Sequence, residues 1–526
     1  MIAGYFWQSF IPGLVIVRTF FGMIDVILKN KSACLTKLLG GINRMARILT
    51  TKILTPNEIE VMKEKVETLL STKGVKIDHL QVMEILQNAG AEVETASGAV
   101  RFPKAVIAKA LQSIPKQFTL AAPDPQYDLT FPLPDGKFYT RTCTGGMNYL
   151  TENGDYHNIT IAEVIEWIQL VNSLDTIHFC ALPSTSGKSV PGEAIDIHTL
   201  RAVLEHSKKH IWVQPYEAAN VKYLLDLAAA RAGGKEQLRK RPIISFITCS
   251  VPPFQFKYMD MEALYQSCLY GVPIQPCSLP AAGANAPVTP QGIALLSAAE
   301  VMAQIIMAQL ITPGLPVIAT PLLFAMDMLT TYTLQSPIET TLGRMAAIQL
   351  FEEGYNIPAH SYGSGTDSFV LDGQCMAERT SLTHMLALAG ASVLGGAGQL
   401  EVAKTISPLQ LIIDNDIFAM TEKMLGGLEI SDEMMAWQEI MGLTGKESFV
   451  DMDHTFDHFR DSLRLPTFNR DSRPNWVKAG SKDMLARAKD VYQTIKENYE
   501  PIAIPSEILR QMDEIIKQAD LQLVGK

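Results

Sequence analysis

The chain has 526 residues, of which 47% are hydrophobic and 19% charged, and its formal net charge is −10. The acidic balance argues against nucleic acid as a partner, and ordinary glycine and proline contents exclude a collagenous or low-complexity chain. Seven scattered cysteines without a C-x-x-C pair indicate neither a disulfide framework nor a zinc ribbon. We therefore expect a globular protein in a reducing, cytoplasmic compartment.

The first 50 residues form an apolar leader. The run Ile2–Leu28 is long enough to span a membrane, but it contains Arg18 and Asp25 and lacks the flanks of a signal peptide. Three interpretations stay open: a marginal anchor, a terminal element docked on the body, or translated upstream sequence. Met45 is a plausible start for the third.

A module of helices and a hairpin is expected over residues 51–135. Thr55-Pro56-Asn57-Glu58 has the pattern of a capping box with proline at the first helical position. A second helix is predicted from Asp78 to Gly90, followed by a hairpin turn at Ser97-Gly98 and a third helix from Pro103.

Eight short β-type runs alternate with seven helical stretches between residues 136 and 450. The runs are Phe138–Cys143, Ile177–Leu182, His210–Gln214, Ile243–Cys249, Val272–Cys277, Pro316–Thr320, Ile357–Ser361 and, more weakly, Ala391–Leu394. Capping boxes at Thr160 and Ser336, and the cap and proline at Thr289-Pro290, start three of the helices.

This alternation predicts an α/β fold with a parallel sheet, because parallel strands need crossover connections. Eight such units are what a closed (β/α)8 TIM barrel requires. A doubly wound open sheet fits the same pattern, but no G-x-G-x-x-G follows the first run, so the barrel is favoured over residues 136–450. The polar remainder, residues 451–526, predicts a C-terminal helical extension packed on the barrel.

The reacting groups of such a barrel lie at the carboxyl ends of its strands. The segments that follow the runs are aromatic, glycine-rich and neutral: Gly145–Tyr149, Gln214-Pro215, Cys249-Ser250, Cys277-Ser278, Thr320-Pro321, His360–Gly363 and Gly395–Gly398. They contain no paired carboxylates, no Ser-His-Asp spacing and no H-E-x-x-H motif. General acid–base chemistry and metal hydrolysis are therefore disfavoured, and we expect no metal site.

Each candidate also has a plain structural interpretation. The glycine runs Gly145-Gly146 and Gly395–Gly398 could bind phosphate through their backbone, but tight turns at the rim of the barrel are favoured. The cysteines Cys249, Cys268 and Cys277 match no zinc spacing, so buried free thiols are favoured over thiolate ligands. The aromatic residues near strand ends suit either a cation-binding cage or ordinary packing. A histidine at the rim, His360, either orients a substrate or is simply hydrogen-bonded.

Several long blocks of the chain carry a resemblance to a known family. They are LTPNEIEVMKEKVETLLSTKGVKI, GAVRFP, TCTGGMNYLTENGDYHNIT, PSTSGKSVPGEAIDIHTLRAVLEHSKKHIW, SYGSGTDSFVLDGQCMAERT, DHTFDHFR and NRDSRPNWVKAG. From about Ile53 to Ile502 the chain resembles the corrinoid-dependent trimethylamine methyltransferases, and it does so over none of the apolar leader. The resemblance implies the barrel fold predicted above and a methyltransferase activity.

The founding members of that family carry pyrrolysine in the loop after the seventh strand, where it activates the methylamine. The corresponding stretch here, Gly365–Asp372, contains only standard residues, with Phe369 near the position. This departure indicates the non-pyrrolysine branch, which includes glycine betaine methyltransferases. Methyl transfer to Co(I) is a displacement in which a quaternary ammonium leaves as a neutral amine, whereas a tertiary amine needs activation. A neutral aromatic site suits the quaternary substrate.

We therefore expect transfer of a methyl group from a betaine-type quaternary amine to the corrinoid (cobalamin) of a cognate carrier protein, with no cofactor bound directly. The residues expected at the ammonium end are Tyr149, Trp212, Tyr362 and Phe369. Those expected at the polar tail are Asn148, Gln214 and His360. The loop that positions the substrate contains Gly363, Gly365, Asp367 and Phe369. A homo-oligomer is expected as well.

Three further functions stay open. The substrate of the same reaction could be trimethylamine or another methylamine. A zinc-dependent methyltransferase acting on a thiol or alcohol is a second possibility. The third is a non-catalytic barrel that binds quaternary amines or docks a corrinoid protein.

Overall fold

A computed structural model describes residues 49–185, 188 and 190–525. The apolar run Ile2–Leu28 and the rest of the leader up to residue 48 lie outside the described residues. Contacts group the described chain into two units. The large unit comprises Leu49–Leu425 together with the segment from Arg460 to the C-terminus, and the small unit contains Gly426–Phe459.

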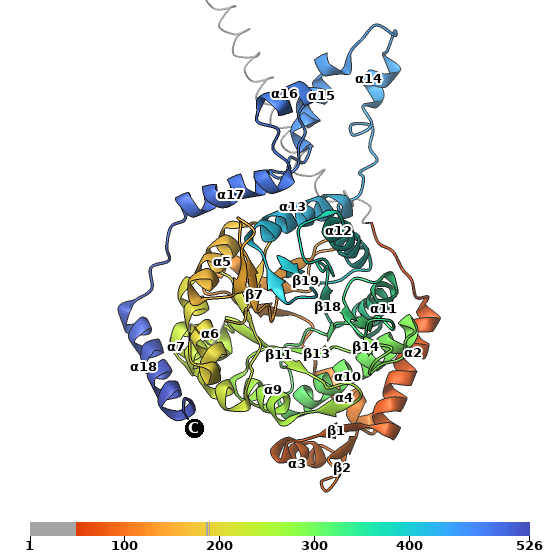
Figure 1. The fold of residues 1–526 in the computed structure, drawn as a ribbon. Helices are drawn as coiled ribbons and strands as arrows, with labels where there is room; N and C mark the ends of the chain where they lie inside the picture. Colours follow the sequence, from red (N-terminus) through yellow and green to blue (C-terminus); the bar gives the residue numbers. More distant parts are fainter. Residues whose placement is uncertain (1–48, 186–187, 189, 526) are drawn as a thin grey trace, which may run out of the picture. The chain divides into compact units, whose positions relative to one another are not determined.

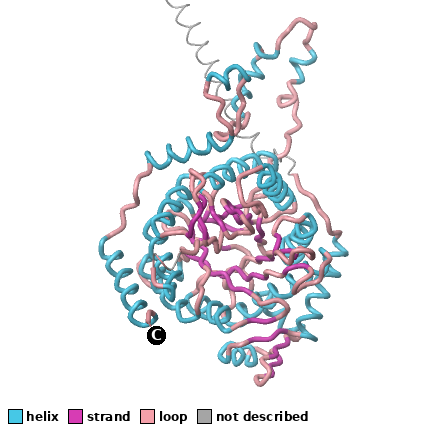
Figure 2. Tube along the Cα trace, viewed as in Figure 1, coloured by secondary structure: helices cyan, strands magenta, loops and turns pink. Residues whose placement is uncertain are grey.

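Eight parallel strands form the centre of the large unit (Figures 1 and 2). They are β6 (Tyr139–Thr142), β9 (Phe179–Ala181), β10 (His210–Val213), β11 (Ile244–Cys249), β13 (Ile274–Ser278), β15 (Thr320–Pro321), β18 (His360–Tyr362) and β19 (Val393–Ala397). Their order in the sheet is β15-β13-β11-β10-β9-β6-β19-β18, and a parallel bridge between Ala319 and Ala359 connects the two ends. Each of the eight predicted runs contains or overlaps one of these strands, so the predicted (β/α)8 fold is confirmed.

Helices follow the strands in strict alternation and surround them (Figure 1). They are α5 (Ile161–Ser173), α6 (Ile195–His206), α7 (Val221–Ala232), α9 (Tyr258–Tyr270), α10 (Pro290–Ile311), α11 (Ile338–Gln349), α12 (Gly373–Leu388) and α13 (Pro408–Leu425). A short α8 (Lys235–Lys240) lies between α7 and β11. Among the described residues α10 is the one helix long and apolar enough to cross a membrane, and 83% of its most apolar window is buried within the fold.

Most of the predicted helix starts are confirmed. Thr55 and Thr160 form complete capping boxes, and Thr289 caps α10 ahead of Pro290. The capping box predicted at Ser336 is wrong, because α11 begins after Pro337 and has no side-chain cap. The Ser336 backbone N–H instead donates to the Asp367 carboxylate over 3.2 Å.

A hairpin closes the amino-terminal end of the barrel. It consists of β4 (Phe118–Leu120) and β5 (Leu129–Phe131). Tyr139 and His210, the first residues of β6 and β10, both contact this region: the Tyr139 hydroxyl lies 3.1 Å from the backbone nitrogen of Thr130, and His210 Nδ1 lies 2.7 Å from the Ala121 carbonyl oxygen. Phe131 is buried in one cluster with Trp212 and Tyr362. The carboxyl ends of the strands are therefore left as the site of chemistry.

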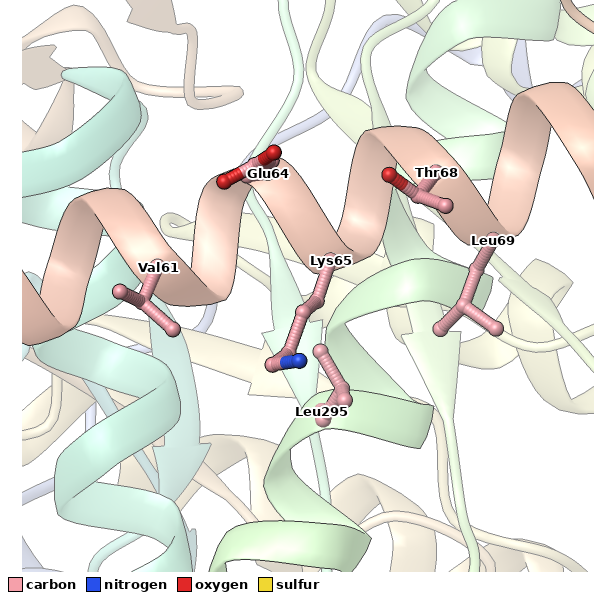
Figure 3. Close-up of a pocket in the computed structure, with 6 residues that line it drawn as sticks. All are labelled: Val61, Glu64, Lys65, Thr68, Leu69 and Leu295. Carbon is pink, nitrogen blue, oxygen red and sulfur yellow. The ribbon is translucent and has the colours of Figure 1, made fainter.

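The N-terminal helices pack on the outer wall of the barrel. They are α2 (Pro56–Thr68), α3 (Leu80–Asn88) and α4 (Lys104–Ser113), and all three contact α10. A small sheet of β1 (Val75–Ile77), β2 (Glu92–Glu94) and β3 (Ala99–Arg101) is extended by β12 (Gln255–Phe256) from the connection after β11. Figure 3 shows Lys65 of α2 and Leu295 of α10 pointing toward each other across a pocket of about 400 Å³.

The last two helices also lie against the barrel. The first, α17 (Met484–Asn498), contacts α5 and α13, and α18 (Ser506–Leu523) contacts α6 and α7. Ion pairs of Lys496 with Glu166 (3.5 Å) and of Arg201 with Asp513 (2.8 Å) accompany these contacts.

The small unit differs from the large one in the exposure of its apolar side chains. It contains α14 (Trp437–Met441) and α15 (Asp453–His458), and most of its large apolar side chains are exposed. The last barrel helix, α13, ends at Leu425, just before this unit begins.

Candidate active site

A buried arginine occupies the interior of the barrel. Arg141 of β6 is fully buried, and its Cζ lies 3.8 Å from the centre of the Trp212 ring and 5.3 Å from that of Tyr362. Arg141 Nε donates to Nε2 of His360 over 2.9 Å. Arg141 Nη1 donates to the Thr142 carbonyl and to the Thr144 hydroxyl. Strands β6, β10 and β18 thus bring a cation, two aromatic rings and an imidazole together.

Glycines make room for this arrangement. A Cβ atom at Gly395 of β19 would lie 2.6 Å from His360 Nε2 and 2.8 Å from Arg141 Cζ. Gly396 has a φ of 98°, and a Cβ atom there would lie 2.6 Å from Nε2 of Gln399. Gly395 and Gly396 lie within strand β19 rather than in the tight turn expected at the rim, and their missing side chains allow close packing inside the barrel.

Burial sets the protonation states of these groups. It lowers the pKa of His360 well below the usual range, and the Arg141 charge lowers it further. The imidazole is therefore neutral and accepts the Arg141 hydrogen bond at Nε2, which assigns its proton to Nδ1, 3.4 Å from the Thr320 hydroxyl. Burial raises the pKa of Tyr362 to about 12. Neither side chain is suited to donate a proton to an amine at neutral pH.

The structure gathers only some of the predicted aromatic residues. Trp212 and Tyr362 belong to one buried cluster, and the ring of Trp212 lies 5.6 Å from that of His360. Tyr149 belongs to the larger core cluster instead, and its ring contacts His157. Phe369 lies in the loop after β18 and is 62% exposed. The protein's own guanidinium covers the Trp212 face, so these four residues do not form an open cage.

Two other residues predicted to bind the polar tail, Asn148 and Gln214, lie outside the group around Arg141. Asn148 begins β7 (Asn148–Leu150) and holds that strand in place, since its Oδ1 accepts from Asn158 over 3.0 Å and its Nδ2 donates to the Lys404 carbonyl. Gln214 directly follows β10 and is half-buried.

The loop Gly363–Asp372 is tied down by hydrogen bonds. The Asp367 carboxylate accepts the backbone N–H of Gln335 (2.7 Å) and that of Ser336 (3.2 Å), while burial raises its pKa. A Cβ atom at Gly365 would lie 2.6 Å from Oε1 of Gln335, and one at Gly363 would lie 2.7 Å from the Leu394 side chain. Asp367 and both glycines thus set the path of the loop.

A left-handed turn, which the sequence does not predict, meets this loop. Glu401, Val402 and Ala403 have φ values of 54°, 54° and 67°. Glu401 N donates to the carbonyl of Ser368, and Val402 N donates to that of Thr366. Three consecutive residues with side chains rarely adopt this conformation, and such strain concentrates at functional sites. No glycine or asparagine in this tripeptide signals the turn.

Arg141 is absent from the predicted site residues, although the sequence contains a signal for it. It is the only Asp, Glu, Lys or Arg inside the eight predicted strand runs. Like the predicted candidates Trp212 and His360, Arg141 lies inside one of the runs. A charge within an otherwise apolar barrel strand indicates a buried functional group, because burying it is costly.

The cysteines of the site region are free thiols. Cys249 and Cys277 are register partners on β11 and β13, and Cys268 lies on α9. Burial raises the pKa of Cys268 to about 12. Within the described ranges, no three His, Cys, Asp or Glu residues are placed to hold a metal ion.

A family model described as trimethylamine methyltransferase (MTTB) matches residues 30–523. The chain belongs to the trimethylamine methyltransferase family. The family resemblance inferred from the sequence blocks is thereby confirmed, and the chain is a member of a methyltransferase family.

Several relatives match over most of their length. The trimethylamine methyltransferase MttB of Desulfitobacterium hafniense (strain DSM 10664 / DCB-2) is 29% identical over 86% of this chain and 90% of that protein. MttB of Methanosarcina barkeri (strain Fusaro) is 28% identical over 90% and 96%. The glycine betaine methyltransferase of Desulfitobacterium hafniense (strain Y51) is 24% identical over 89% and 96%. The crystal structure of the Methanosarcina barkeri monomethylamine methyltransferase MtmB aligns with a TM-score of 0.49 at 13% identity, covering 94% of this chain and 92% of that one.

Proposed function

We propose that this family member transfers a methyl group from a betaine-type quaternary amine to the Co(I) corrinoid of a separate carrier protein. The observation that carries the proposal is the protonation state of the groups around Arg141. Burial lowers the pKa of His360 and raises that of Tyr362 to about 12, so both groups are weak proton donors at neutral pH. The loop stretch Gly365–Asp372 supplies only standard residues for activation.

The chemistry of a quaternary substrate fits this site. Co(I) attacks the methyl carbon, the C–N bond breaks, and its electron pair stays on nitrogen, so a neutral tertiary amine leaves without a proton. The cobalt supplies the electron pair of the new Co–C bond and becomes Co(III). The protein then has to hold the methyl group in line with the cobalt and exclude water.

The roles proposed for the predicted residues follow their positions. Tyr362 and Phe369 remain our candidates for the ammonium end, while Gln214 and His360 remain candidates for the polar tail. Trp212 instead serves as the platform for Arg141. Tyr149 and Asn148 support the barrel mouth from outside the buried cluster that contains Trp212. The loop Gly363–Asp372 would face both the substrate and the carrier protein.

The test uses the full chain, a reduced corrinoid carrier and a panel of amines. We expect methyl-Co(III) absorbance to appear with at least one of glycine betaine, carnitine and proline betaine, and no such change with trimethylamine. Turnover of trimethylamine without turnover of any quaternary amine would overturn the proposal. The 28–29% identical relatives, which are named for trimethylamine, make that comparison essential.

The same assay distinguishes the proposed enzyme from a binding protein and from a zinc enzyme. A non-catalytic barrel would bind a quaternary amine tightly and yet leave a competent carrier unmethylated. A zinc-dependent methyltransferase would contain stoichiometric zinc by metal analysis, bound through thiolates.

A cytoplasmic location and self-association complete the proposal. The six cysteines of the described chain are free, which suits a reducing compartment. Within the described residues, the segment Gly426–Phe459 exposes Leu428 (75%) and Ile430 (74%). We expect light scattering to give more than one protomer for the wild type, and a smaller mass for a variant with both residues changed to serine.

A further inference from the structure

We infer that Arg141 is a binding residue for the carboxylate of the substrate, which is therefore a zwitterion with a quaternary ammonium at one end. This inference rests on the proposed function and specifies its substrate class. It starts from the charges inside the barrel.

The large unit contains three fully buried arginines, and two of them have acidic neighbours. Arg379 forms an ion pair of 2.6 Å with Asp414. Arg344 donates to the backbone carbonyl of Gln335, and the charge of Asp367 favours its protonated form. Arg379 is therefore balanced by an ion pair within the chain, and Arg344 has an acidic group, Asp367, near enough to favour its charge.

Arg141 differs from both. Among the described residues no carboxylate forms an ion pair with it, and the groups that favour its charge are the phenol of Tyr362 and the thiols of Cys143 and Cys277. Burial lowers the pKa of Arg141, but an arginine stays protonated in proteins. A buried cation without a counter-ion is costly, so an anion from outside the chain would stabilise it strongly.

The donors of this pair are only partly used. Arg141 Nε and Nη1 are engaged by His360, Thr142 and Thr144, and the guanidinium also interacts with the Tyr362 phenol, but Nη2 is shielded from solvent and has no acceptor in hydrogen-bonding geometry in the described structure. The indole Nε1 of Trp212, on which the guanidinium is stacked, is likewise buried without an acceptor. Arg344 Nη1 and Trp167 Nε1 are also buried without an acceptor, but Arg141 and Trp212 differ because two such donors belong to one contacting pair, which suits an acceptor from outside the chain.

A carboxylate is the acceptor that suits these donors best. Guanidinium N–H groups form strong, charge-assisted hydrogen bonds with carboxylate oxygens, and stacking on Trp212 fixes the plane of the group. The bond to neutral His360 fixes its rotation. A ligand that is only cationic would be repelled by Arg141, whereas a zwitterion brings its own counter-charge. Its ammonium end would then lie on the side of the barrel mouth.

The substrate class follows from this pairing. It comprises trimethylammonium carboxylates such as glycine betaine and carnitine. Choline, whose tail is a neutral hydroxyl, and trimethylamine, which has no tail, are excluded.

The experiment measures binding by calorimetry without any corrinoid carrier, so that it stays separate from the methyl-transfer assay. We expect the wild type to bind glycine betaine or carnitine at least about 30-fold more tightly than choline. The variants Arg141→Gln and Arg141→Lys are compared with Arg231→Gln, which alters a partly buried arginine on α7 that donates to the Leu204 carbonyl. R141Q should lose the preference for carboxylates, R141K should retain part of it, and R231Q should retain all of it.

Kinetics with the carrier add a second measurement. R141Q should raise the KM for the carboxylate substrate much more than it lowers kcat, which a purely structural role would not do. Equal binding of choline and glycine betaine by the wild type would overturn the inference, even if both are demethylated and the proposed function holds. Wild-type affinity in a folded R141Q would overturn it as well. If R141Q fails to fold, the inference is tested by the affinities of R141K and by the wild type's preference for glycine betaine or carnitine over choline.

Discussion

The guanidinium of Arg141 lies over the indole of Trp212, with its Cζ 3.8 Å from the centre of the ring. Both side chains are fully buried. An aromatic face that would otherwise suit a ligand cation is thus occupied by a cation of the protein, which turns this part of the barrel into a receptor for negative charge.

Removal of the Trp212 ring should weaken substrate binding. The change Trp212→Leu takes away the platform that orients Arg141, and a buried cation–π contact contributes on the order of 2 kcal/mol, so we expect KM to rise by at least about tenfold. Trp212→Phe keeps a ring and should have a smaller effect. Steady-state kinetics of both variants, with thermal unfolding as a check of folding, test this. An unchanged KM in W212L would contradict it.

Gly395 should not tolerate a side chain. A Cβ atom there would lie 2.6 Å from His360 Nε2, so Gly395→Ala must displace the imidazole or Arg141. We expect loss of substrate affinity and a destabilisation of about 1–3 kcal/mol, measured by calorimetry and urea unfolding. Gly373→Ala is the matched control, because nothing lies within 4 Å of its added Cβ. If G395A binds like the wild type, the geometry described for this pair is incorrect.

The buried ion pair of Arg379 and Asp414 should be essential for stability. Asp414→Asn leaves the Arg379 charge unpaired in the interior, which typically costs about 3–5 kcal/mol of unfolding free energy. Urea denaturation measures the loss. The exposed pair of Arg510 and Glu507 serves as the control, and we expect no measurable change for Glu507→Gln. Similar midpoints for D414N and E507Q would disprove the expectation.

Stability should depend on pH through Glu352. Its Oε1 accepts the backbone N–H groups of Ala359 and Ser392 at the start of β18 and β19, and burial raises its pKa from 4.5 to about 7. Between these values the folded state binds more protons than the unfolded state, so this residue's contribution to stability falls as pH rises from about 4.5 to 7.

Glu352→Gln keeps the oxygen that accepts both bonds and removes the titration. The difference in unfolding free energy between wild type and variant should therefore change by up to about 3 kcal/mol between pH 4.5 and pH 7. Urea unfolding at both pH values measures it. A difference that is constant with pH would show that Glu352 does not titrate in this range.

The barrel was predictable from the sequence because its signals are local. Apolar runs mark the strands, caps and prolines mark several of the helices, and even the weak run Ala391–Leu394 contains the start of β19. Ser336 shows the limit of such signals: the local pattern suits a cap, but the distant Asp367 carboxylate takes its backbone N–H.

The site was less predictable because it depends on side-chain directions within the closed barrel. Trp212, Tyr362 and His360 were named from their positions near strand ends, and the structure does bring them together. Tyr149 was also predicted from its position after a strand, but its side chain on β7 packs in a different hydrophobic cluster. The turn at Val402 depends on hydrogen bonds to Thr366 and its neighbours, which no local pattern reveals.

The hairpin of β4 and β5 has a consequence for the order of events in turnover. In the proposed reaction the amine and the carrier protein would both use the carboxyl end of the barrel, because this hairpin packs at the amino-terminal end. A docked carrier would then block exchange of the small molecule. Kinetics should accordingly show a compulsory sequence, in which the amine enters before the carrier binds and the demethylated product leaves after the carrier departs.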